Sequence, residues 1–151
     1  MSTRSHIGIL NTSSRRNPKS TEIIYCHFDG YPSHNGSLLL NHWIGAKKVR
    51  ALMAIGDISS LDEEIGEKHD FDNRDGKVVT AYGRDRGETR IHSQKFGTFE
   101  TMCLSLKDTW AEYIYMYDVK HACWRWTKLY QKQGKFLHLK KLTQKDCGKT
   151  S

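Results

Sequence analysis

The sequence predicts a single α+β domain in which short helices pack on one face of a mainly antiparallel β-sheet. Strand-like runs lie near both ends of the chain and stretches with helical spacing lie between them, an order typical of α+β proteins. The length of 151 residues suits one hydrophobic core. We therefore expect one domain over residues 1–130, followed by a basic C-terminal extension over residues 131–151 that is partly disordered.

The first half of the chain predicts a hairpin, two helices and a loop. Residues 5–10 and 21–28 are rich in β-branched residues, and the segment between them contains the turn formers Asn, Ser and Pro. Apolar residues near helical spacing predict short helices over 35–43 and 46–56, the second of which ends at a glycine. Residues 56–76 mix turn formers with isolated apolar residues, which indicates a loop held against the core.

The second half supplies one more helix and the remaining strands. Residues 77–83 predict a strand, and residues 98–107 predict a short helix. Apolar and polar residues alternate over 111–119 and 122–130, as in half-buried strands joined by a turn. Residues 136–142 predict a further strand.

The alternation puts Tyr113, Tyr115 and Tyr117 on one face of their strand, and Ile114 and Met116 on the other. Such a tyrosine face could stack nucleic-acid bases, as in single-strand binders. More often it is the side of a sheet that a helix or a second subunit covers, and we favour this interpretation.

Nearly all of the net charge of +7 lies in the C-terminal part of the chain. Residues 119–151 hold nine Lys and Arg against one Asp, whereas residues 1–118 are almost balanced. A basic segment attracts nucleic acid through salt-sensitive electrostatics. This segment is rich in lysine, and sequence-specific base recognition usually needs the bidentate guanidinium of arginine. A solvated terminus is therefore the favoured interpretation.

The cysteines, histidines and apolar residues exclude several classes of protein. The four cysteines form no C-x-x-C pair, which argues against a zinc ribbon and against a disulfide framework. The eight histidines form no H-x-x-x-H pair, so we expect no metal site and no cofactor. No apolar run approaches the roughly 20 residues that cross a bilayer, and the N-terminus lacks the apolar core of a secretory signal. These features predict a cytoplasmic protein without a membrane partner.

The stretch YCHFDGYPSHNG, residues 25–36, contains the most varied polar side chains. The pair Asp29 and Gly30 signals a turn, and His27, Asp29 and Tyr31 alternate along the exit from a strand. His27 and Asp29 could form a general base, but no nucleophile accompanies them. We therefore expect ligand binding rather than catalysis from this stretch.

A second polar stretch, AYGRDRGE, covers residues 81–88. In extended backbone Arg84 and Arg86 share one face, about 6 to 7 Å apart, which suits a phosphate or a carboxylate. The alternative is that these arginines form structural salt bridges with nearby aspartates. Tyr82 adds an aromatic ring beside them.

The order of the motifs TRSHIGI, YCHFDGY, GDISSL and AYGRDRGE resembles a family of small, uncharacterised proteins of tailed bacteriophages and prophages. The resemblance covers residues 3 to about 126, and the chain departs from it between Asn73 and Val78 and after Tyr130. It implies expression inside an infected bacterium, where small phage proteins often bind a host enzyme, a defence complex or a defence signal. The family has no assigned active site to transfer to this sequence.

The leading hypothesis is a non-enzymatic phage accessory protein, for host takeover or anti-defence, that sequesters an anionic nucleotide-like signal in the cytoplasm of the infected host. Its arginines would hold phosphate while an aromatic ring stacks a base. The expected ligand site is formed by His27, Asp29, Tyr31, Tyr82, Arg84 and Arg86.

Three alternatives remain open from the sequence. The protein could inhibit a host nuclease or polymerase by binding it through the tyrosine and tryptophan face. It could bind nucleic acid through the basic C-terminal segment, or act as a small hydrolase or nuclease through His27 and Asp29. A homo-oligomer built through the aromatic C-terminal sheet would suit the leading hypothesis.

Overall fold

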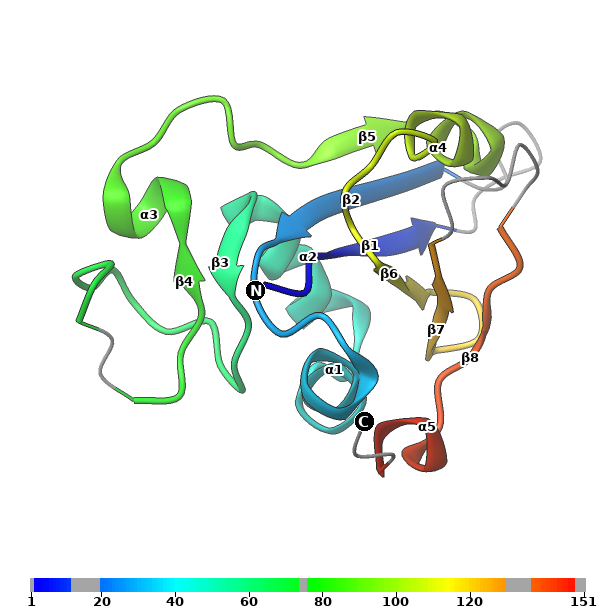
Figure 1. The fold of residues 1–151 in the computed structure, drawn as a ribbon, viewed down its shortest axis with the longest axis horizontal. Helices are drawn as coiled ribbons and strands as arrows, with labels where there is room; N and C mark the ends of the chain where they lie inside the picture. The colour runs from blue at the N-terminus through cyan, green and yellow to red at the C-terminus, as the bar shows by residue number, and fades with distance from the viewer. Residues whose placement is uncertain (1, 12–19, 74–75, 130–136, 149–151) are drawn as a thin grey trace.

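The computed structural model describes residues 2–11, 20–73, 76–129 and 137–148. Within these residues it confirms a single α+β domain, with one mixed sheet of eight strands and short helices packed against it (Figure 1). The strands are β1 (Ser5–Asn11), β2 (Ser20–Cys26), β3 (Ile58–Ser60), β4 (Thr80–Ala81), β5 (Gln94–Phe96), β6 (Tyr113–Asp118), β7 (Cys123–Lys128) and β8 (Lys140–Lys141). The helical segments are the π-helical turn η1 (Pro32–Gly36), α1 (Ser37–His42), α2 (Ala46–Ile55), α3 (Tyr82–Arg86), α4 (Phe99–Ser105) and α5 (Gln144–Gly148).

The two halves of the chain meet at the centre of the sheet. The strand order is β4-β3-β2-β1-β6-β7-β8, and β5 pairs with β2 outside this order. β1 forms the predicted antiparallel hairpin with β2 and also runs parallel to β6. Gly8 in β1 permits this close pairing, because a Cβ atom there would lie 2.4 Å from the carbonyl oxygen of Glu22. A side chain at this position would push the two central strands apart.

Helices cover both faces of the sheet rather than the one face expected from the sequence, because both faces of β6 present apolar side chains. On one face, Leu39 of α1 and Leu52 of α2 pack in the same apolar cluster as Ile7 and Tyr115. α5 joins this face, and Figure 1 shows it beside α1. On the opposite face, α4 packs against the strand residues that alternate with the tyrosines. This second cluster consists of Ile23, Met102, Leu106, Ile114 and Met116.

The tyrosine face of β6 is covered by the domain itself. Tyr115 is fully buried and donates a hydrogen bond of 2.6 Å to the carbonyl oxygen of Gly30. Tyr117 is only 5% exposed, and Trp124 of β7 is buried with its indole N–H bonded to the carbonyl oxygen of Trp43. Tyr115, Tyr117 and Trp124 therefore serve as core, whereas Tyr113 at the start of β6 is only partly buried.

Some elements differ from those that the sequence predicts. The predicted loop over 56–76 contains β3, which pairs with β2 at Cys26. The predicted strand over 77–83 is reduced to β4, because the chain enters a helix at Tyr82. Neither β5 nor α5 was predicted, since segments of three and five residues are too short to show a hydrophobic period.

The described part of the basic C-terminal segment packs onto the domain. β8 pairs with β7, and the side chains of Leu142 and Cys147 are buried. Residues 131–136 and 149–151 of the predicted extension lie outside the described residues. In the part of the chain that is described, no helix has both the length and the apolar character that a membrane span requires.

Candidate functional site

His27 lies directly after β2, where its side chain is hydrogen-bonded to that of Tyr25. The Tyr25 hydroxyl and His27 Nδ1 are 2.7 Å apart, and the Arg4 guanidinium acts on the same hydroxyl through its charge and a hydrogen bond. Since arginine can only donate, the Tyr25 oxygen accepts from Arg4 and its proton points to His27 Nδ1. Burial and the charge of Arg4 lower the pKa of His27, which agrees with a neutral imidazole that accepts at Nδ1.

Asp29 and Tyr31 form a separate pair. The Tyr31 hydroxyl donates to Asp29 Oδ1 at 3.1 Å, and this hydrogen bond raises the pKa of Tyr31. Asp29 has a φ of 58°, and the Gly30 N–H donates to the carbonyl oxygen of Thr3 at 2.8 Å. The predicted turn is therefore present, and His27 pairs with a tyrosine rather than with Asp29.

The expectation that residues 81–88 are extended is wrong, because residues 82–86 form α3. Arg84 points back under this helical turn, where its two terminal nitrogens donate to the carbonyl oxygens of Ile65 and Val79 at 2.7 Å. Its Nε donates to Asp85, whose side chain is inaccessible to solvent. Burial alone would raise the pKa of Asp85, but the hydrogen bonds from Arg84 and from backbone N–H groups outweigh it and lower the pKa. Arg84 thus holds the fold of this segment.

Arg86 and Tyr82 lie at the surface of the same helical turn. The Arg86 guanidinium carbon is 4.2 Å from the ring centroid of Phe71 and 5.0 Å from that of Tyr82. Glu88 forms an ion pair with Arg86. Burial raises the pKa of Tyr82, while the charge of Arg86 lowers it. Tyr82 therefore contributes an aromatic ring to this surface, and Glu88 balances the charge of Arg86.

The neighbouring surface contains an open groove of about 560 Å³ lined by Arg4, Tyr25, Thr109 and Trp110. We call it the Trp110 groove. The Trp110 side chain is 77% exposed, the largest exposure among the large hydrophobic residues that the structure describes. Arg4 forms no ion pair with a carboxylate among the described residues. The groove thus combines an exposed aromatic ring with a cation that has no carboxylate partner in the described part of the chain.

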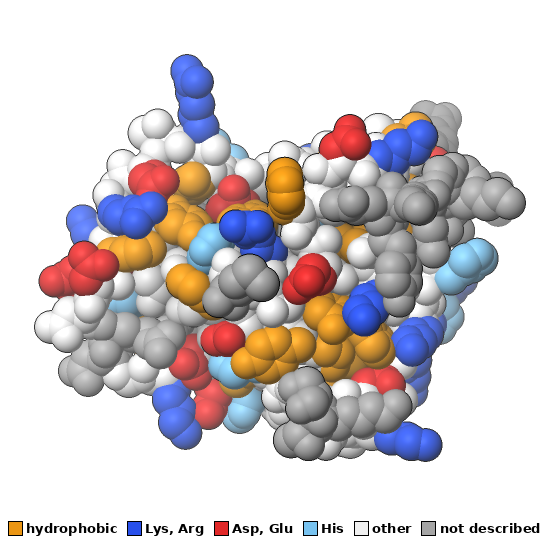
Figure 2. Space-filling model, in the orientation of Figure 1, with side chains coloured by type: hydrophobic (Ala, Val, Ile, Leu, Met, Phe, Trp, Pro, Cys, Tyr) orange, Lys and Arg blue, Asp and Glu red, His pale blue; other side chains and the backbone are white. Residues whose placement is uncertain are grey.

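Tyr25 connects the Trp110 groove to His27, because the Tyr25 hydroxyl lies 2.7 Å from His27 Nδ1. Burial is the largest influence on the pKa of Tyr25 and raises it. Figure 2 shows hydrophobic, Lys or Arg, and His side chains gathered on this face around α3 and the end of β2. None of the six residues expected at the ligand site lines the Trp110 groove. His27 is joined to its wall through the contact with Tyr25, whereas Tyr82, Arg84 and Arg86 lie on α3.

A partly buried histidine, His6, fixes the wall that contains Trp110. Figure 1 shows the segment between α4 and β6 passing in front of β1 and β2. The Thr109 hydroxyl lies 2.9 Å from His6 Nε2, and His6 Nδ1 lies 3.3 Å from the carbonyl oxygen of Ile24. The Ala111 N–H donates to the same Thr109 hydroxyl. Burial lowers the pKa of His6 to about 4, so the imidazole is neutral and donates from Nδ1 to the carbonyl while accepting from Thr109.

Arg4, Thr109 and Trp110 lie outside the two polar stretches that the sequence indicates as binding residues. Arg4 lies before the first strand, and Trp110 lies in the connection between α4 and β6. One sequence signal was available, since Trp110 interrupts the polar run KDTWAE outside any predicted helix or strand. A tryptophan in such a position has no core face to join, and large exposed aromatic residues often mark binding sites.

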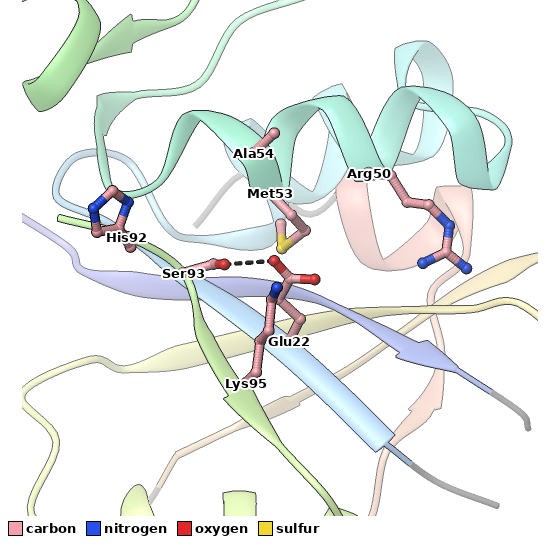
Figure 3. A pocket seen from close by; sticks show the side chains of 7 residues that line it. All are labelled: Glu22, Arg50, Met53, Ala54, His92, Ser93 and Lys95. Atoms are coloured by element: carbon pink, nitrogen blue, oxygen red, sulfur yellow. Dashed lines mark hydrogen bonds between the residues drawn. The ribbon is translucent and has the colours of Figure 1, made fainter.

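A different pocket of about 500 Å³ lies between α2, β2 and β5 (Figure 3). Arg50, His92 and Lys95 supply positive or basic groups at its wall, and Glu22 lies among them. Ser93 donates to the Glu22 carboxylate, and Arg50 donates to Asn11 at 2.8 Å. The central carboxylate offsets the surrounding cations, so this pocket is less suited to an anion than the Trp110 groove.

The described residues contain no group of three or more His, Cys, Asp or Glu side chains that could hold a metal ion. Comparison with protein-family models, with curated proteins and with solved structures finds no match to this chain.

Proposed function

We propose that the protein is a non-enzymatic binding protein that holds an anionic, nucleotide-like ligand in the Trp110 groove. The observation that carries this proposal is the shared position, at one open groove, of the exposed Trp110 ring and the Arg4 guanidinium, which has no carboxylate partner among the described residues. Base stacking on an aromatic side chain contributes about 1–3 kcal/mol. A guanidinium is well suited to a phosphate because it donates two parallel hydrogen bonds.

The partners of the three nearby arginines indicate how many phosphate groups the ligand carries. Arg86 is already paired with Glu88, and Arg84 is bound to backbone carbonyl oxygens and Asp85. Arg4 is then the cation available to the ligand, which favours one phosphate group over a chain of phosphates. Neutral His27 adds a donor at Nε2 for a sugar hydroxyl or a phosphate oxygen.

The geometry favours binding over catalysis. A general-base histidine is usually oriented by a carboxylate, whereas the ring of His27 is oriented by Tyr25. The resemblance to small proteins of tailed bacteriophages supports a role in host takeover or anti-defence. Sequestration of a signalling nucleotide in the cytoplasm of an infected bacterium would be such a role.

The first experiment is native mass spectrometry of the full chain purified from infected cells, followed by identification of any released small molecule. Isothermal titration of the purified protein with adenosine 5′-monophosphate and with the released molecule then measures affinity. We expect Trp110→Ala to weaken binding about 5- to 150-fold through lost stacking, and Arg4→Ala to weaken it about tenfold or more. No released ligand, together with no binding of the tested nucleotides, would reject sequestration.

Two variants serve as matched controls. Leu104→Ala removes another exposed apolar side chain, which is 58% exposed. Arg50→Ala removes an arginine from the pocket of Figure 3. Both should leave nucleotide affinity within about twofold, because neither side chain lines the Trp110 groove. A larger loss of nucleotide affinity for Arg50→Ala than for Arg4→Ala would assign the ligand to the pocket of Figure 3.

A second candidate is a protein-binding inhibitor anchored by Trp110. Tryptophan is enriched among residues that dominate binding energy at interfaces, and Phe28 is a further exposed aromatic residue at 44%. The buried Trp124 cannot take this anchoring role without unfolding. Affinity purification from infected cells separates the candidates: a host protein retained by the wild type and lost with Trp110→Ala, without nucleotide binding, would favour the inhibitor.

A further inference from the structure

A smaller pocket of about 220 Å³ lies between η1, the β6–β7 pair and α5. We call it the aromatic pocket. Figure 2 shows hydrophobic side chains exposed on this face above α5, beside a basic and an acidic side chain. Its wall includes Tyr31, Ser33, Tyr113, Trp126, Lys140 and Asp146.

The rings of this pocket are held by the sheet. Trp126 is directly opposite Tyr115 in the β6–β7 pair, and their ring centroids are 6.3 Å apart. Tyr113, two residues along β6, lies 6.1 Å from Trp126 by the same measure. Tyr31 reaches the pocket from the turn before η1 and is fixed by its hydrogen bond to Asp29. Because three separate segments supply these rings, the pocket is preformed.

The pocket already holds an ammonium group. The Lys140 Nζ atom lies 4.5 Å from the centroid of the Trp126 ring. Asp146 accepts a hydrogen bond from the Trp126 indole N–H at 3.4 Å and two more from Thr143. Burial alone would raise the pKa of Asp146, but these hydrogen bonds and the charge of Lys140 lower it, so the carboxylate is ionised. An aromatic face beside a carboxylate is a favourable environment for a cation.

We propose that the aromatic pocket binds a methylated ammonium group, which takes the position of Lys140 over Trp126. Lys140 is exposed and lies on the two-residue strand β8, so its side chain can turn into solvent at little cost. A methylated ammonium is less strongly hydrated than a lysine amine and gains more from contact with aromatic rings. After Lys140 leaves, Asp146 gives the pocket a negative charge that disfavours an anion.

The test is a titration of the ¹⁵N-labelled full chain with tetramethylammonium chloride, followed by NMR at the Trp126 indole N–H. Sodium chloride at equal ionic strength is the control for salt, and Trp126→Phe identifies the signal. We expect a saturable shift of this signal with tetramethylammonium and none with sodium. Lys140→Met should tighten binding about two- to fivefold, because it removes the competing ammonium.

Lys141→Met is the matched control. It removes the same charge from the neighbouring position of β8, but Lys141 lies opposite Arg125 and outside the aromatic pocket. It should leave the affinity for tetramethylammonium unchanged. Both lysines are exposed, and a thermal melt checks that both variants remain folded.

The proposal would be overturned if neither the wild type nor Lys140→Met showed a saturable shift of the Trp126 signal with tetramethylammonium. Weaker binding of tetramethylammonium by Lys140→Met than by the wild type would also overturn it, as would an equal gain in affinity for Lys140→Met and Lys141→Met. A shift of the Trp126 signal by adenosine 5′-monophosphate instead of tetramethylammonium would also overturn it. The proposal is independent of the Trp110 groove, since the two sites share no lining residue.

Discussion

Protonation of His6 should destabilise the protein in mild acid. The histidine pKa is about 4 in the folded protein against 6.5 for an unperturbed side chain, because burial disfavours the charged ring. The unfolded chain therefore binds the additional proton between these two values. The stabilisation is complete above the unfolded pKa and is lost as the pH falls toward the folded pKa.

The size of the effect follows from this difference. Each pKa unit corresponds to about 1.4 kcal/mol, so a change from about pH 7.5 to about pH 5 should remove about 2 kcal/mol of unfolding free energy through His6 alone. Protonation also puts a proton on Nε2, where the Thr109 hydroxyl donates in the neutral state. The wall that contains Trp110 should loosen in the same pH range.

The assay is urea unfolding of the wild type and His6→Gln at both pH values. Glutamine stays neutral, and the remaining titratable groups are common to both proteins. We expect the wild type to lose about 2 kcal/mol more than the variant on acidification, and the NMR titration of the His6 ring to have its midpoint near pH 4. Equal losses in the two proteins, or a midpoint near the unperturbed value, would refute the reasoning.

Three other predictions concern the fold around the site. Arg84→Ala should cost about 3–5 kcal/mol of unfolding free energy because it removes the guanidinium partner of the buried Asp85 carboxylate, which keeps only the backbone donors of His69 and Ala81 and the neighbouring His69 ring. Arg86→Ala should cost about 1 kcal/mol or less. Urea unfolding of both variants compares them, and equal costs would contradict a structural role for Arg84. Tyr115→Phe should lower stability by about 1–3 kcal/mol through the lost hydrogen bond of its buried hydroxyl, measured by thermal melting against the wild type, and an unchanged melting temperature would contradict it. The Cys26 thiol should resist modification by Ellman's reagent in the native state, because it is fully buried with its pKa raised to about 11; reaction as fast as that of the half-buried Cys123 would show that the end of β2 opens readily.

The predicted ligand site required extended backbone at Arg84 and Arg86, and the few residues around them in the sequence do not determine that conformation. Extended backbone would put Arg84 and Arg86 on one face, but the helical turn of α3 separates them. Arg84 then points inward to carbonyl oxygens that belong to another loop. The choice between a ligand arginine and a structural arginine was therefore made by the carbonyl oxygens of Ile65 and Val79, which only the folded backbone directs toward Arg84.

Hydrophobic periodicity in the sequence determined the α+β class, the β1–β2 hairpin, the α2 and α4 helices and the division of β6 into a tyrosine face and an aliphatic face. Each of these depends on side-chain spacing within one segment. Only the tertiary structure decided that β1 pairs with β6, that the tyrosine face is core, and that Arg4, Tyr25 and Trp110 line one groove. Such contacts join segments up to about a hundred residues apart, and they depend on how the whole chain buries its apolar surface rather than on local spacing.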